Sequence, residues 1–485
     1  MLMKYHGFGV WETVVNECVE GGWIRGDAHD YDAWAKLVGD ERWSYKNMLP
    51  YMKKTETHWS AEDALPAAVA AQHGFSGPVF QASVSSTGRK FPLRDNVKQA
   101  WAEIGISELP GGDGNAGSPL GLAELQENRR DGLRQLSSSA YPLEGVTVLT
   151  DSLVKRVIFS TDLYTTTATG IELADGTKKY ARKEVILSCG AYRTPQLLML
   201  SGIGPEDILA ENGIEPVLDS PEVGANLWDH LMIPSFWKLL PSVAAQGVAM
   251  GSNNALFTQK EFGTGIPLDW IVSTTLPREE LIAAITADEG SEPAADHPLL
   301  IQTRTFVETF IAYAAGGAAS PAIPFDGSHI SGTVIGLMPT SRGKVTISSS
   351  SPVDAPVIDP KYFSTSVDKL AMRTGLRQLA KVLMKTNAGK AFCEDEAIAE
   401  GHKSILSAND AELEARVAAL TGTTFHPGGT AAMGRVVDSE LNVIGLRGLR
   451  VVDASVLPVP IASHLQVALY ALAEQAADII GHSKQ

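Results

Sequence analysis

The chain has 485 residues, of which 44% are hydrophobic and 20% charged, and its formal net charge is −16. This composition is too apolar for an intrinsically disordered protein, and the acidic balance argues against a broad nucleic-acid-binding surface. Three widely separated cysteines, Cys18, Cys189 and Cys393, exclude a disulfide framework and a CxxC metal site. At about 100–200 residues per domain, the length predicts two or three structural units.

No segment of the sequence predicts a signal peptide or a membrane span. Residues 1–9 lack a sustained apolar run, and the longest uncharged stretch, residues 309–325, is interrupted by two glycines and two prolines. A membrane span needs about 20 apolar residues. We therefore expect no membrane partner and, by default, a cytoplasmic protein. Residues 309–325 are predicted to form a short helix that enters a loop.

The first half of the chain predicts helices followed by a strand meander. Amphipathic spacing predicts helices near residues 30–34 and 95–104. From residue 146 onward, short runs rich in β-branched residues alternate with turn residues, as in a meander of strands. The predicted strands are residues 146–149, 153–159, 169–173 and 185–188. Two further helices are predicted at residues 194–200 and 205–211.

The second half predicts an inserted unit followed by a return to the first one. Residues 224–422 are rich in Ser, Thr and Pro, with strands expected at 332–337 and 344–348 and a charged helix at 368–385. The chain closes with a buried strand at 448–453 and a helix rich in Ala and Leu at 465–480. Because this last strand and helix most naturally join the first unit, we expect a ligand in the crevice between the two units.

Two of the eleven histidines stand in unusual surroundings. His426 lies in a glycine-dense loop, residues 425–434, whose glycines permit the backbone to approach a flat ligand closely. His464 lies at the entrance to the last helix, where unpaired N–H groups and a partial positive charge suit an anion that develops during a reaction. For His464 a plain solvent-facing residue at a helix start is an equally weighted alternative.

A third unusual string spans residues 190–204. Its sequence predicts a strand that ends on Gly190, a helix that begins near Thr194, and a stop at Ser201 and Gly202. An ordinary capped strand–helix connection would explain it, and so would close backbone approach to a cofactor phosphate.

These three strings, in this order, resemble the glucose–methanol–choline (GMC) oxidoreductase family. Residues 190–204 resemble the family's second signature, and residues 425–434 resemble its catalytic-histidine loop. Residues 451–455 with 463–464 resemble its C-terminal flavin and second-histidine segment. The resemblance extends from about residue 22 to the end. It is closest to fungal enzymes of secondary-metabolite pathways.

The resemblance implies FAD as cofactor and oxidation of an alcohol carbon, with hydride passing to the flavin. His426 would be the base that takes the hydroxyl proton, and His464 its hydrogen-bonding partner. A neutral imidazole suits this role because its ordinary pKa is about 6.5. No metal site is implied. The residues implied to contact the cofactor are Val154, Asp453, Ala454, His464, Leu465 and Gln466.

The expected fold class is α/β with α+β elements. The resemblance implies a Rossmann-like FAD-binding domain over residues 1–225 and an inserted substrate-binding domain with a mainly antiparallel sheet over residues 226–420. Residues 421–485 would return to the FAD-binding domain and carry both histidines.

One departure from the family concerns the start of the chain. Family members open with a strand, a Gly-x-Gly-x-x-Gly turn and a helix that together hold the FAD pyrophosphate. Here the Gly-Phe-Gly at residues 7–9 lacks the third glycine and a preceding strand. We therefore expect an incomplete FAD-binding domain, by truncation or in a natural form. A natural form would bind FAD weakly or not at all.

The leading hypothesis is an FAD-dependent alcohol oxidase or dehydrogenase acting on a small-molecule alcohol, with the oligomeric state left open. The alternatives are a flavin-containing but non-redox lyase or cyclase of the same family, and a catalytically impaired remnant. A hydrolase is weakly supported because the sequence contains no Gly-x-Ser-x-Gly elbow. A metalloenzyme is weaker still, since the sequence lacks a His-x-x-x-His pair.

Overall fold

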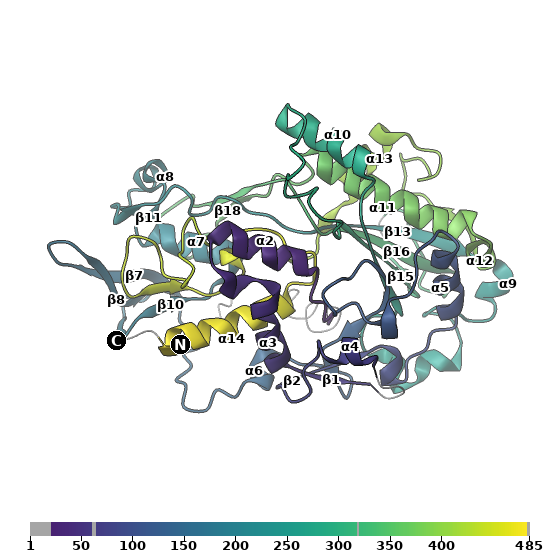
Figure 1. Cartoon of the computed structure of the whole chain (residues 1–485), viewed down its shortest axis with the longest axis horizontal. Coiled ribbons are helices and arrows are strands. Elements are labelled where there is room, and N and C mark those ends of the chain that lie inside the picture. The colour runs from purple at the N-terminus through teal and green to yellow at the C-terminus, as the bar shows by residue number, and fades with distance from the viewer. Residues whose placement is uncertain (1–20, 61–64, 318–319, 483–485) are drawn as a thin grey trace.

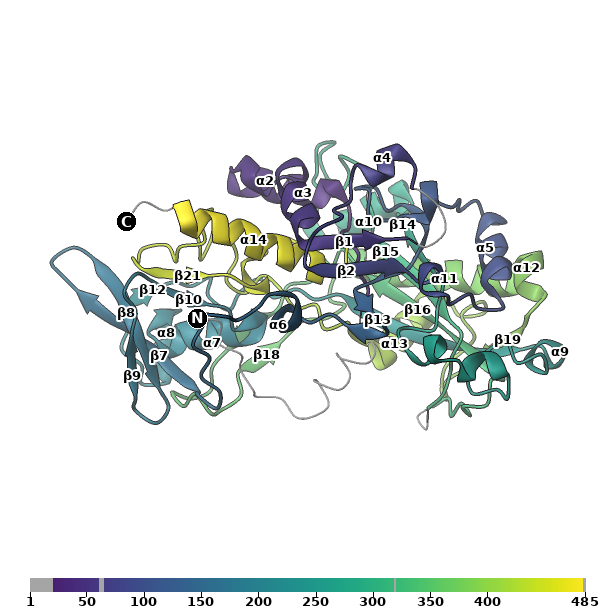
Figure 2. The ribbon, with the colours of Figure 1, turned by 90° about the horizontal axis from the view of Figure 1, so that it is seen from below.

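The computed structural model describes residues 21–60, 65–317 and 320–482. The molecule is elongated, with a large antiparallel sheet and its helices in one half (Figure 1). The other half contains a short parallel strand pair, a three-stranded meander and the C-terminal helix α14 (Gln466–His482) (Figure 2). His426 lies on the segment that leads from the large sheet to the parallel strand pair, and His464 lies just before α14.

The large sheet has seven strands in the order β19-β13-β16-β15-β14-β3, with β20 also paired to β13. Every pairing in it is antiparallel. Its strands are β3 (Gly121–Glu124), β13 (Leu231–Leu239), β14 (Trp270–Thr274), β15 (Val307–Ala312), β16 (His329–Gly336), β19 (Cys393–Ala397) and β20 (Gly422–Thr423).

One face of this sheet is covered by helix α11 (Ser366–Lys385) (Figure 1). The helix approaches most closely at Gly375, where a Cβ atom would lie 2.4 Å from Val334 and 2.8 Å from Val307. Because side chains alternate along a strand, the neighbours of these valines, Glu308 and Ile335, point away from α11. The helices that pack around α11 are α5 (Arg94–Ala102), α10 (Arg278–Glu289), α12 (Asn387–Lys390) and α13 (Asp410–Leu420).

The parallel pair consists of β10 (Val185–Leu187) and β21 (Leu449–Val451). Leu187 is paired with Val451, so both strands end at the same sheet edge, where ligands of α/β proteins bind. Helix α7 (Gly190–Leu200) follows β10 directly. The antiparallel meander beside this pair is formed by β7 (Val154–Thr161), β8 (Thr166–Leu173) and β9 (Lys178–Tyr180).

The N-terminal segment bridges the two halves. Helix α3 (Tyr45–Thr55) packs against α14, and a small sheet lies beside both (Figure 2). Trp34 of helix α2 (Ala28–Val38) stacks on Trp43 with ring centroids 4.7 Å apart, and both are fully buried. The small sheet contains β1 (Glu56–Trp59), β2 (Val79–Ser83) and β4 (Gln126–Glu127).

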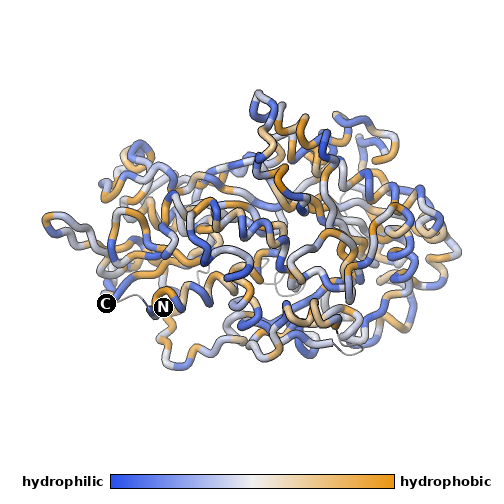
Figure 3. The backbone as a smooth tube through the Cα atoms, viewed as in Figure 1, coloured by the Kyte–Doolittle hydropathy of each residue, from blue (hydrophilic) through white to orange (hydrophobic). Residues whose placement is uncertain are grey.

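Hydrophobic and hydrophilic residues interchange along most of the elements (Figure 3). Within the described ranges no helix combines the length and the apolar character that crossing a membrane requires. The remaining short elements are α4 (Ala67–Ala70), α6 (Ser137–Ala140), α8 (Glu206–Glu211), α9 (Pro241–Ala244), β5 (Arg129–Arg130), β6 (Leu133–Arg134), β11 (Ile203–Gly204), β12 (Leu218–Asp219), β17 (Lys344–Thr346) and β18 (Val357–Asp359).

Three of the expected elements differ from the structure. Residues 146–149 form no strand, because their apolar side chains are exposed and none of the described strands pairs with them. Residues 309–317 and 320–325 form no helix; strand β15 continues to Ala312 and a loop follows, since β-branched and aromatic residues at 309–311 fit the middle of a sheet. Helix α7 begins at Gly190 rather than near Thr194, and Gly190 adopts a positive φ of 77° that favours glycine.

Candidate active site

The structure brings His426 and His464 together. Their ring centroids are 5.3 Å apart, with an angle of 53° between the planes. His426 lies in the loop after β20, and His464 lies two residues before α14 begins. Both side chains are partly exposed.

Three neighbours fix the position of His426. The Asp229 carboxylate accepts a hydrogen bond from the backbone N–H of His426 at 3.0 Å. On the ring, Nδ1 lies 3.0 Å from the Thr424 hydroxyl and 3.1 Å from Nδ1 of His230. Asp229 in turn accepts bonds from the Thr423 and Tyr362 hydroxyls, each at 2.5 Å.

The hydrogen-bond directions assign the proton of the His426 ring. The Thr424 hydroxyl donates its single hydrogen to the backbone carbonyl of His230, 3.0 Å away. It can therefore only accept from His426, so the proton of a neutral His426 is on Nδ1. Nε2 of His426 keeps its lone pair and is the nitrogen able to accept a proton.

Burial keeps this part of the site neutral. Desolvation of the ring, followed by the neighbouring His230 and His464, lowers the pKa of His426 well below its ordinary value. Burial and then His464 lower the pKa of the fully buried His230 to about 3. Burial also raises the pKa of Asp229, against the opposing hydrogen bonds from Thr423 and Tyr362.

His464 has a different environment. Its Nε2 lies 2.9 Å from Oε1 of Glu308, a fully buried carboxylate on strand β15 of the large sheet. Its other nitrogen, Nδ1, packs against Gly22, where a Cβ atom would come within 2.6 Å. The ring of His464 therefore contacts a carboxylate, whereas the ring of His426 contacts the His230 ring and the Thr424 hydroxyl.

Asp453 and Ala454 lie where the parallel strands end. The Asp453 carboxylate accepts bonds from the Gly190 N–H at 3.0 Å and the Thr194 hydroxyl at 2.6 Å. It thereby ties the end of β21 to the start of α7. The Ala454 carbonyl accepts from the N–H of Gly429, in the His426 loop, at 3.2 Å.

Val154 lies at the far side of this region. It is buried at the start of β7 and lines a cavity of about 110 Å³. Residues 184–189, which form β10 and the positions on either side of it, also line this cavity. Leu465 is buried next to His464, whereas the Gln466 side chain donates to the Gly22 carbonyl at 2.5 Å and accepts from Asn128 at 3.0 Å.

Two of these places could hold parts of an extended cofactor. The 17-residue helix α14 begins at Gln466, and the first N–H groups of a helix have no intrahelical partner, which suits a negatively charged ring system beside His464. At the other end, the cavity at Val154 adjoins the edge where β10 and β21 terminate.

Sequence reasoning did not single out four residues of this site as functional: Asp229, His230, Glu308 and Thr424. Nothing in the sequence around Asp229 and His230 indicates that His230 contacts His426. Glu308 did carry a signal, since it is a lone acidic residue in an apolar β run, residues 306–313.

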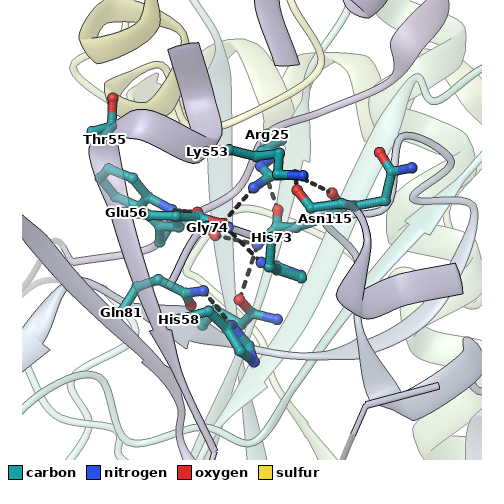
Figure 4. Close-up of polar contacts among 12 residues, drawn as sticks. Arg25, Lys53, Thr55, Glu56, His58, His73, Gly74, Gln81 and Asn115 are labelled. Carbon is teal, nitrogen blue, oxygen red and sulfur yellow. Dashed lines mark hydrogen bonds and ion pairs between the residues drawn. The ribbon is translucent and has the colours of Figure 1, made fainter. Parts of the chain in front are cut away.

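A second buried cluster, which we call the scaffold network, consists of Trp23, Arg25, Glu56, His73 and Asp113. Figure 4 shows Arg25 and His73 beside Glu56. Glu56 accepts from Arg25 at 2.5 Å, from His73 at 2.9 Å and from the Trp23 indole at 2.8 Å. The other nitrogen of His73 lies 3.1 Å from Asp113. Two cations thus face two carboxylates, and both nitrogens of His73 are bonded.

Part of the scaffold network lies in a glycine-rich loop whose spacing resembles that of a nucleotide-binding turn. Residues 112–117 have Gly-x-Gly-x-x-Gly spacing, but they form a loop before β3 rather than a turn between a strand and a helix. Asp113 and Asn115 of this loop hold the network together, and Asn115 accepts from the Arg25 N–H at 2.8 Å. In the described part of the chain, no group of His, Cys, Asp and Glu has an arrangement that could hold a metal ion.

Comparison with known proteins places these features in a family. Two family models, both described as GMC oxidoreductase, match residues 12–232 and 339–473. The N-terminal match begins at residue 12 and gives no support to the expected loss of an N-terminal unit, whose position lies outside the described residues.

Individual proteins agree with the family match. The GMC-type oxidoreductase acuG of Aspergillus aculeatus is 43% identical over 95% of this chain and 82% of its own length. Alcohol dehydrogenase [acceptor] of Pseudomonas putida is 30% identical, over 94% of this chain and 79% of its own. A structure of formate oxidase from Aspergillus oryzae RIB40, studied for FAD modification, has a TM-score of 0.79 and 27% identity, covering 95% of this chain and 82% of that one.

These comparisons confirm the predicted α/β fold class with its mainly antiparallel second sheet. They also confirm FAD as the cofactor at the level of the family. The chain belongs to the GMC oxidoreductase family.

Proposed function

We propose that this chain is an FAD-dependent enzyme that oxidises an alcohol, with His426 as the base. The observation that carries the proposal is the unshared lone pair on Nε2 of His426, beside a second imidazole and the start of α14. A neutral imidazole positioned in this way can accept the proton of a substrate hydroxyl.

When bound, FAD supplies the acceptor for the hydride that leaves the carbinol carbon. The protein residues manage the proton: the substrate O–H bond breaks and its proton moves to Nε2 of His426. Asp229 and Thr424 hold the ring so that Nδ1 stays protonated and Nε2 faces the substrate. His464 lies beside this base, with 5.3 Å between the two ring centroids.

We assign the cofactor contacts to the residues around the parallel strand ends. Val154 would contact the adenine, and Asp453 with Ala454 the pyrophosphate and ribityl region. His464, Leu465 and Gln466 would contact the isoalloxazine end. The proposed division of the chain is residues 1–225 and 421–485 for FAD and 226–420 for substrate.

The name of the Pseudomonas relative, an alcohol dehydrogenase, supports an alcohol as the substrate class. The 43% identity to a protein of Aspergillus aculeatus supports a fungal affinity. A place in fungal secondary metabolism remains our prediction, because the name of that relative states only an oxidoreductase.

Anaerobic bleaching of the flavin absorbance by candidate alcohols tests the proposal. We expect His426→Ala to slow flavin reduction by about 10²–10⁴-fold, the usual range for a general base, while FAD content stays at the wild-type level. His402→Gln, a histidine in the turn after β19, serves as the control and should react like wild type.

Two results would contradict the proposal. Normal bleaching by His426→Ala would remove this residue as the base. A yellow wild-type protein whose flavin no alcohol reduces, but which rearranges or cleaves a substrate, would favour the non-redox lyase or cyclase.

A further inference from the structure

A second cavity, of about 410 Å³, has a mostly cationic lining, although the whole chain carries a formal net charge of −16. It is lined by β1, β2, the β5–β6 hairpin and residues of the segments 86–89 and 260–264. None of the described residues that line it belongs to the candidate active site. The charged lining residues are the cationic Arg89, Arg129, Arg130 and Lys260 and the acidic Asp131 and Glu261. A cavity of this size can hold a small organic ligand.

Two arginines in the buried part of the lining face one carboxylate. Glu127 pairs with Arg89 and lies 3.4 Å from Nε of Arg129, and all three side chains are more than nine-tenths buried. Arg89 is also fixed in the wall, because its Nε donates to the Thr87 hydroxyl at 3.0 Å and its Nη1 to the Thr264 carbonyl at 2.8 Å. Within the described ranges, two buried guanidiniums beside one carboxylate make this part of the cavity favourable for an anion.

Two aromatic side chains form another part of the lining. Trp59, at the end of β1, and Phe80, on β2, have ring centroids 5.9 Å apart, with 34° between the planes. Trp59 is 40% exposed, whereas most tryptophans are largely covered. The Arg130 guanidinium lies 5.9 Å from the centre of the Phe80 ring. An aromatic surface beside a cation suits a ligand that carries a negative charge next to a ring.

The cavity is separate from the histidine pair, although one short segment contacts both. Glu127 and Arg129 contribute to the buried part of the cavity wall. Asn128, between them, donates instead to Gln466 at the start of α14, at 3.0 Å. Because successive side chains of an extended segment point to opposite sides, a ligand in the cavity and one at the histidine pair would occupy different places.

We propose that this cavity binds an aromatic carboxylate, with its ring against Trp59 and Phe80 and its carboxylate on Arg129 and Arg130. The site is additional to the flavin and alcohol sites proposed above and does not depend on alcohol oxidation. A guanidinium matches the planar carboxylate in charge and in hydrogen-bond geometry, and the two rings supply stacking. A neutral aromatic amide lacks the first interaction and an aliphatic acid lacks the second.

Calorimetric titration of the full chain with 2-naphthoate tests the proposal. We expect 2-naphthamide and cyclohexanecarboxylate to bind at least about tenfold more weakly than 2-naphthoate, since each loses one of the two interactions. Raising the salt concentration should weaken the binding of 2-naphthoate but not that of the amide.

Variants of the lining locate the ligand. Arg129→Gln and Trp59→Ala should each weaken 2-naphthoate binding about tenfold, and the exposed Arg130→Gln about 2–5-fold. Arg130→Gln and Trp59→Ala keep the test valid if loss of Arg129 disturbs the fold, which circular dichroism checks. The matched controls are Lys183→Gln, an exposed cation, and Tyr164→Ala, an exposed aromatic residue; both should bind like wild type.

Several results would overturn the proposal. They are equal affinities for 2-naphthoate and 2-naphthamide, no binding of 2-naphthoate, and an affinity that the three lining variants leave unchanged. Weaker binding in His426→Ala instead would place the acid at the histidine pair and would also overturn it. Because calorimetry measures binding and not turnover, failure of the proposed alcohol oxidation would leave this result unaffected.

Discussion

The chain buries histidine against carboxylate in two regions, and the two regions use the pairing differently. In the scaffold network, His73 lies between Glu56 and Asp113, and both of its ring nitrogens are bonded. In the candidate active site, Oε2 of Glu308 has no hydrogen-bond partner among the described residues, whereas both oxygens of Glu56 and of Asp113 are bonded.

This difference in bonding distinguishes the scaffold network, which stabilises the fold, from the candidate active site, which could carry out a reaction. The scaffold network pairs Arg25 and His73 with two carboxylates, so its charges cancel and its acceptors are used. The candidate site has more histidines than carboxylate contacts, and burial keeps His426 and His230 neutral. A buried carboxylate oxygen without a partner beside two partly exposed histidines can be completed by another molecule.

The largest expected effect comes from breaking the scaffold network. Glu56→Gln removes the charge that compensates Arg25 and His73 in a fully buried position. We expect the free energy of unfolding to fall by about 3–5 kcal/mol, as for other broken buried ion pairs. Urea denaturation measures this loss. Glu308→Gln should cost less stability, since Glu308 has one partner, and equal losses would contradict the comparison.

The second prediction uses pH to separate the two regions. His230 has a pKa of about 3 in the folded protein and about 6.5 when unfolded, so the unfolded chain binds the extra proton between these values. Stability should therefore fall as pH decreases through this window, by up to roughly 1.4 kcal/mol per pH unit, and His230→Asn should flatten the slope.

His73 should show the opposite sign. Hydrogen bonds and charge from Asp113 and Glu56 raise its pKa, although burial opposes them. Its contribution is therefore complete below about pH 6.5 and is lost as pH rises through the folded-state pKa. His73→Gln should remove the slope on the alkaline side only. Denaturation at several pH values tests both variants, with the exposed His482→Gln as a control.

The sequence predicted most of the local structure and both histidines of the pair. Helices near α2, α5, α11 and α14 and the strands of the meander follow from periodicity and turn residues. Residues 146–149 mislead because an apolar run is a strand only where a partner strand is present. Strand β15 was missed because its position in the middle of the sheet is set by β14 and β16, which are distant in sequence.

The site was harder to predict than the elements. His426 and His464 were found because each lies in a distinctive local string. Glu308, His230 and Thr424 act through contacts between segments far apart in the chain, such as the 196 residues that separate His230 from His426. A lone Glu in an apolar strand is a signal, but it does not indicate which residue the carboxylate will meet.

The smallest expected effect tests how firmly the His426 loop is held. Tyr362→Phe removes one of the two hydroxyl bonds to Oδ2 of Asp229, while the Thr423 hydroxyl and the His426 N–H stay bonded. Loss of one hydrogen bond with its acceptor still satisfied should lower the free energy of unfolding by about 1 kcal/mol. Flavin reduction should slow only a few-fold, because His426 keeps its backbone anchor. Tyr164→Phe, at a position that is 94% exposed, is the matched control and should change neither quantity. If Tyr362→Phe slowed the reaction as much as His426→Ala, the phenol itself would have to take part in the chemistry, and the site would extend beyond the histidine pair and Glu308.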